Sequence, residues 1–187
     1  MRDPGNSHLK AWAEEYTEAP FFFEQESKYG PRLVAWSEEP DQTKQAFYAI
    51  VERLPQAVEV LLKISVGKSP EEKPLWTRYM GTVDRHELVR IVKENETYVF
   101  SDGMHQLCLK DPGSDRYLAF DDHGIFFLYL PLSEDMEIFK TLGFENRRAE
   151  PIFGVPHFQH TAADSEKMEM NFITKLGLEK ANSDLEK

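Results

Sequence analysis

The residues best suited to metal chemistry lie close together near the carboxyl end of the chain. His157 and His160 would share one face of a helix, and Asp164 would join them two turns after the first histidine. Imidazole and carboxylate groups are common ligands of zinc and iron. Pro156 directly precedes the pair, however, and no glutamate adjoins either of these histidines as in the helical motifs of zinc hydrolases. Two loop histidines are therefore favoured, and we expect no metal.

A second group of potential ligands, Asp121, Asp122 and His123, lies in a segment rich in turn-forming residues. Two carboxylates and an imidazole would complete a metal site if residues 157–164 folded back onto them. Turn formation accounts for the two aspartates without a metal, because their side chains bond to nearby backbone amides. We therefore predict a turn at this position.

Four further side chains are candidates for catalysis or anion binding. A buried His105 would be a base with a shifted pKa, whereas a hydrogen-bonded histidine at the rim is the commoner outcome. Cys108 would be a nucleophile only beside a base, and the sequence shows none. Arg147 and Arg148 would hold a phosphate or carboxylate, or pair with local acids. The sequence contains no Walker loop, GxGxxG, GxSxG or HExxH motif, so we expect no cofactor.

The composition limits the class of protein. The chain has 187 residues, a net charge of −11 and one cysteine. Acidic residues exceed basic ones by 33 to 22, which argues against nucleic acid and anionic membranes as partners. A single cysteine and the lack of a secretory signal favour the cytoplasm. We expect one domain over residues 1–187, frayed at 1–8 and 178–187.

The clearest structural pattern is a series of four short apolar runs between residues 97 and 130. Turn signals separate the runs: Asp102-Gly103, the DPGS of residues 111–114 and the DDHG of residues 121–124. Because short links join only antiparallel neighbours, the pattern predicts a four-stranded β-meander.

The remaining chain predicts an α+β fold. Alternating or apolar runs predict strands at 32–37 and 57–66, so one or two strands should extend the meander. Between three and five helices should pack on the sheet, and helical periodicity or capping signals place them at 9–16, 41–54, 84–94, 133–142 and 165–176. Strands cluster instead of alternating with helices, as in α+β domains.

The last hairpin of the meander has apolar residues on both faces. A two-residue turn at Asp122-His123 would pair Phe120 with Ile125 and place Tyr117, Phe126 and Leu128 in a contact surface. Either helices cover both faces, or this face binds a partner or a second copy of the chain. We favour the second, because exposed apolar patches mark interaction sites.

Two functions follow as expectations. The first is a non-catalytic, acidic intracellular protein that binds a macromolecule, most simply another protein, in the manner of inhibitors and toxin-immunity proteins. The alternative is a small enzyme or ligand-binding domain with a site between the meander and residues 144–163. Its candidate catalytic residues are His105, His123, His157 and His160, and Arg147 and Arg148 would bind the ligand.

Overall fold

A computed structural model describes residues 20–66, 75–149 and 164–181 of the chain. Five helices and nine strands make an α+β fold within these residues, as predicted, and all nine strands belong to one sheet. The expected helix at 9–16 and the expected frayed end at 1–8 lie outside the described residues.

The sheet is almost entirely antiparallel. Its strands are β1 (Phe21–Ser27), β2 (Gly30–Trp36), β3 (Ala57–Ser65), β4 (Trp76–Asp84), β5 (His105–Lys110), β6 (Tyr117–Phe120), β7 (Phe126–Tyr129), β8 (Glu145–Asn146) and β9 (Glu179–Lys180). They are ordered β8-β1-β2-β7-β6-β5-β3-β4-β9, and only the short β8 runs parallel to its neighbour β1.

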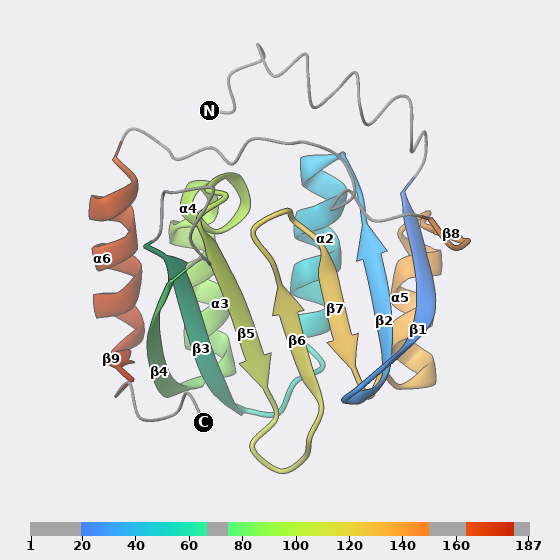
Figure 1. Cartoon of the computed structure of the whole chain (residues 1–187), viewed down its shortest axis with the longest axis horizontal. Helices are drawn as coiled ribbons and strands as arrows, with labels where there is room; N and C mark the ends of the chain where they lie inside the picture. Colours follow the sequence, from blue (N-terminus) through green and yellow to red (C-terminus); the bar gives the residue numbers. More distant parts are fainter. Residues whose placement is uncertain (1–19, 67–74, 150–163, 182–187) are drawn as a thin grey trace.

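The helices all lie on one face of this sheet (Figure 1). They are α2 (Pro40–Val51), α3 (Arg85–Glu94), α4 (Glu96–Ser101), α5 (Ser133–Thr141) and α6 (Ser165–Leu176). The main core fills the space between the two layers, where sheet residues such as Leu62 and Leu128 are fully buried with Phe47, Ile91 and Phe172 of the helices. None of the helices in the described ranges is long and apolar enough to cross a membrane.

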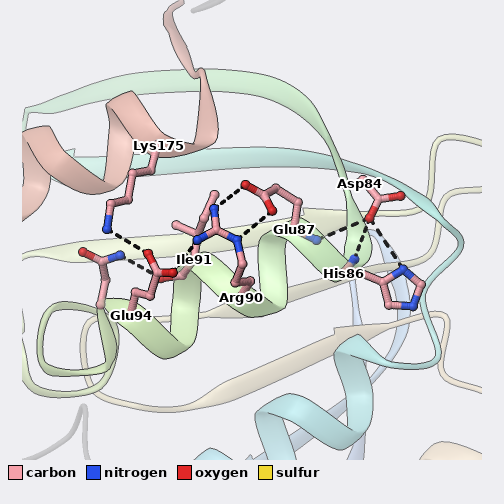
Figure 2. Close-up of polar contacts among 8 residues, drawn as sticks. Asp84, His86, Glu87, Arg90, Ile91, Glu94 and Lys175 are labelled. Atoms are coloured by element: carbon pink, nitrogen blue, oxygen red, sulfur yellow. Dashed lines mark hydrogen bonds and ion pairs between the residues drawn. The ribbon is translucent and has the colours of Figure 1, made fainter.

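Helix α3 begins where the sequence predicts. The Asp84 carboxylate accepts hydrogen bonds from the backbone N–H groups of His86 and Glu87, at 2.9 and 3.3 Å, and so caps the helix (Figure 2). At the other end, Glu94 accepts a bond of 2.9 Å from Lys175 of α6. Ion pairs of this kind on the surface contribute little, so the buried apolar face of α3 carries most of its attachment.

Helix α5 is fixed by a carboxylate with no exposure to solvent. Asp135 accepts a bond from the backbone N–H of Leu132 at 2.7 Å and another from Arg116, just before β6, at 2.7 Å. Arg53, just after α2, lies 3.8 Å from the same carboxylate. Because an unpaired buried charge is costly, this cluster fixes the positions of β6, α5 and the end of α2 relative to one another.

The prediction of a first meander strand before residue 102 is wrong. Residues 96–101 form α4, with Tyr98 and Val99 buried, and Asp102-Gly103 is no hairpin turn. The Asp102 side chain instead accepts a bond from the backbone N–H of Met104 at 2.9 Å. The meander therefore has three strands, β5 to β7, and six strands lie outside it.

The predicted register of the β6–β7 hairpin is also wrong. Phe120 pairs with Phe126 and not with Ile125, so residues 121–125 form a longer loop than the expected two-residue turn. This shift of one residue exchanges the two faces of β7. Phe126 and Leu128 are fully buried under the helices and cannot form a contact surface, whereas Tyr117 stacks on Tyr129 on the opposite face.

Two segments are more ordered than predicted. β4, which the sequence analysis missed, pairs with β3 along its whole length. Glu179 and Lys180, in the segment expected to fray, form β9 beside β4, and Leu178 before them is only 7% exposed. The leucine side chain packs over Gly81, where an added Cβ would lie 3.0 Å from it, so β4 approaches this segment closely.

The two faces of β7 give a test of the observed register. Phe126→Ala should lower the free energy of unfolding by about 3–5 kcal/mol, because it empties a fully buried position. Phe127→Ala, on the half-buried face, should cost about 1–2 kcal/mol. Urea denaturation of both variants measures the difference, and a larger loss for Phe127→Ala would contradict the register.

Candidate functional site

The histidines and arginines proposed from the sequence lie on separate elements. His105 begins β5, His123 lies in the β6–β7 loop, and Arg147 and Arg148 follow β8. His157 and His160 lie outside the described residues. The described candidates therefore form two polar clusters, around His105 and around His123, and a pair of arginines.

His105 lies on the helix-covered side of the sheet and is 3% exposed. Its ring stacks on that of Tyr98, with the centroids 4.3 Å apart, and its Nδ1 is 3.9 Å from Oδ1 of Asp102. Among the described residues, neither His105 Nδ1 nor the Tyr98 hydroxyl has a hydrogen-bond partner. The imidazole is thus held by stacking in the core.

Asp102 links this cluster to α6. Its carboxylate accepts a hydrogen bond of 2.5 Å from the Ser165 hydroxyl, at the start of the helix. Burial alone would raise the pKa of Asp102, but His105, Ser165 and the backbone N–H of Met104 outweigh it, so the pKa is lowered. Because the serine donates to the aspartate and not to the imidazole, the three residues do not form a catalytic triad.

Further along α6, a second carboxylate has a pKa that is shifted in the opposite direction. Burial raises the pKa of Glu169, and the negative charges of Asp102 and Glu166 raise it further. Burial also raises the pKa of the Tyr98 hydroxyl, and the negative charges of Glu169 and Asp102 raise it further. The protonated forms of Tyr98 and Glu169 are thus favoured, whereas Asp102 is favoured as the carboxylate.

The loop between β6 and β7 brings together Asp121, Asp122 and His123. Ligand atoms of all three lie within 4.8 Å of one another, a spacing that would suit a metal ion. One oxygen of Asp121 accepts bonds from the backbone N–H groups of His123 and Ile125, at 3.0 and 2.8 Å, as the turn prediction requires.

His123 acts as the cation of this loop. Its Nδ1 lies 3.1 Å from Asp122 and 3.6 Å from Asp121. Burial alone would lower the pKa of His123, but the two carboxylates raise it to about 9. Asp122 also accepts a bond of 3.3 Å from Gln106 of β5. At neutral pH a protonated imidazole pairs with the carboxylates, and it must lose its proton before it can bind a metal.

The remaining candidates show no activated group. Arg147 bonds to Glu145 at 3.0 Å and lies over the ring of Phe21, and Arg148 is exposed. Burial raises the pKa of the Cys108 thiol, although Lys63 acts against this. A thiol kept protonated in this way is a poor nucleophile.

The sequence analysis only partly anticipated the largest candidate surface, the sheet face turned away from the helices. We call this the open face, because no helix of the described residues covers it (Figure 1). Paired residues form an apolar row across its five central strands: Met80, Leu61, Cys108, Ala119 and Phe127. The alternation of Glu59 and Lys63 in β3 is the sequence signal for this face, but it reveals one strand only.

Toward β1, the open face is more deeply buried. Phe21, Phe23, Val34 and Ile125 form a second apolar cluster there, and each is at most 5% exposed. Ala149, after β8, packs against it, as does Phe127. The accessible part of the open face is therefore its other half, from β7 to β4, where Met80 is 43% exposed.

Comparison of the chain with family models, with curated proteins and with solved structures finds no match. The candidate features of the described residues are two self-paired polar clusters and an open sheet face.

The His123 loop predicts a pH-dependent stability. The pKa of His123 is raised from 6.5 to about 9 by folding, so its contribution is complete below pH 6.5 and is lost as the pH rises through 9. His123→Gln should cost on the order of 2 kcal/mol at about pH 6 and almost nothing at about pH 10. Denaturant melts of both proteins across this range measure the difference, and a cost independent of pH would contradict the assignment.

The same loop predicts the metal content. Because the imidazole is protonated and already paired, we expect no stoichiometric zinc or iron in protein purified without chelator. Elemental analysis measures this directly. One equivalent of metal, lost in His123→Gln and retained in His86→Gln, would show that the loop is a metal site.

Proposed function

We propose that this chain is a non-catalytic protein of the cytoplasm that binds a protein partner through its open face. The observation that carries the proposal is the one-sided arrangement of the helices, which leaves the apolar row partly accessible. Sheets in α+β proteins usually bury one face and solvate the other, and an apolar row on the solvated face is an interaction signal.

The chemistry of the polar clusters agrees with a binding function. His105 is buried under the helices, Ser165 bonds to a carboxylate and the Cys108 thiol is protonated. None of these groups has the nucleophile–base contact that catalysis by acyl or phosphoryl transfer uses. Inhibitors and immunity proteins are examples of such binding domains.

The alternative function, a site between the meander and residues 144–163, depends on His157 and His160. These two histidines lie outside the described residues, and the described candidates do not favour it. His105 and His123 are each paired with their own aspartates, on different elements.

Two exposed methionines on opposite sides of the protein allow a matched test. Met80 is 43% exposed on the open face, and Met170 is 53% exposed on α6. Met80→Asp should reduce capture of the partner from a lysate of the native cells by at least about tenfold, because it places a charge in the apolar row. Affinity capture followed by mass spectrometry measures the loss.

Met170→Asp is the control, since it makes the same chemical change on the helix layer. It should retain the partner at the level of the unaltered protein. If both variants lose the partner equally, or only Met170→Asp loses it, the open face is not the binding surface.

A further inference from the structure

The open face has a regular arrangement of apolar and basic residues. Cations flank its apolar row on both sides. On one side, Arg78 and Lys63 are paired neighbours. On the other side, a row of paired residues runs from Lys110 through Tyr117 and Tyr129 to Arg32. Directly paired residues point to the same side of a sheet, so the four cations and the apolar row share one face.

The arrangement has the dimensions of one helix. Five strands spaced about 4.8 Å apart make the row from Met80 to Phe127 about 19 Å long, which is the length of a helix of about 13 residues. The cation rows lie two residues along the strands from the apolar row, at about 7 Å on either side. A helix about 10 Å wide that lies along the apolar row would therefore place its flanking side chains over the cations.

The cations of this face lie next to its apolar row. Its strand positions carry four cations and four carboxylates, in a chain with a net charge of −11. Of the carboxylates only Glu59 lies in a cation row, because Asp84 caps α3, and Glu145 and Glu179 belong to the edge strands β8 and β9. Lys110 lies 3.9 Å from Glu59, and its side chain is still 44% exposed. Arg32 is held in place by a bond of 2.9 Å to Gln25 and lies 4.6 Å above the Phe127 ring. Arg32 is thus positioned before any partner binds.

We propose that the open face binds an acidic amphipathic helix of its protein partner. Leucine-like residues of that helix contact the apolar row, and its flanking glutamates or aspartates pair with Lys63 and Arg78 on one side and Lys110 on the other. The inference rests on the proposed function and gives the partner's chemistry. The helix completes a second helical layer on the sheet, in the manner of helix-in-groove recognition.

The two other occupants fit less well. A second copy of this chain placed face to face would bring like-charged rows together, which opposes a dimer through this surface. A nucleic acid needs neutralisation of many phosphates, and four cations on a face that also carries four carboxylates supply little of it. Charge complementarity therefore favours an acidic protein segment.

A labelled synthetic helix of about 14 residues is the probe. It carries leucines at the i, i+3, i+4, i+7 and i+11 positions, glutamates on both flanks and alanines elsewhere. Fluorescence anisotropy should show binding to the full-length protein that weakens as salt is added. Replacing the glutamates with lysines, or the leucines with serines, should weaken binding at least about tenfold.

Charge reversal locates the binding surface. Lys63→Glu combined with Lys110→Glu should weaken binding of the acidic helix about tenfold or more, and the milder pair Lys63→Gln with Lys110→Gln should give a smaller loss. Lys93→Glu combined with Lys140→Glu makes the same change of net charge on α3 and α5. This control should change the affinity less than about twofold. Circular dichroism checks that each variant is folded.

Several outcomes would overturn the proposal. They are equal losses in the two charge-reversed pairs, equal binding of the lysine helix, tighter binding of a single-stranded RNA, self-association through the open face, and binding of no probe at all. The proposed function fails separately, because it depends on Met80→Asp and the native partner. Suppose that Met80→Asp loses the partner, but that capture depends neither on salt nor on Lys63 and Lys110. The open face then remains a binding site, and the acidic helix is excluded.

Discussion

The alternation of side chains along the strands is the constraint on which the rest of this structure depends. Successive residues of one strand belong to different environments: Leu62 is fully buried beneath the helices, whereas Leu61 is half-buried on the open face. Because the helices lie on one face only, the register of each hairpin decides which residues form the core. Every functional statement about this chain therefore depends on strand pairing more than on the identity of any single residue.

Elements with local signals were predictable from the sequence. The Asp84 cap started α3 at the expected place, and Gly177 ended α6 in the left-handed conformation with φ of 63°. The regular alternation of β3 and the apolar spacing of α2 were also correct within a few residues. In each case the deciding interactions, such as a cap or a helical stripe, are between residues close in sequence.

The failures have non-local or competing causes. Asp102-Gly103 resembles a hairpin turn, but the residues before it form α4, in which the buried Tyr98 stacks on His105 and packs against Phe172. In the β6–β7 loop, Asp121 closes a wider turn through the backbone of Ile125, which a dipeptide pattern does not reveal. β4 was missed because it carries polar residues and Gly81, and its strand conformation depends on pairing with β3.

The candidate surface was only partly predictable, for the same reason. Tyr117 lies on the open face, but Phe126 and Leu128, its predicted neighbours, do not. The apolar row is assembled from five strands whose order no local pattern gives. In the proposed binding mode the flanking cations have a structural role besides partner choice. Lysines usually protect exposed sheet edges, but here the edge strands β8 and β9 are only two residues long. Lys63 and Lys110 lie on the inner strands β3 and β5 instead. If the proposal holds, they oppose stacking of two open faces and leave the apolar row accessible to a chain of opposite charge.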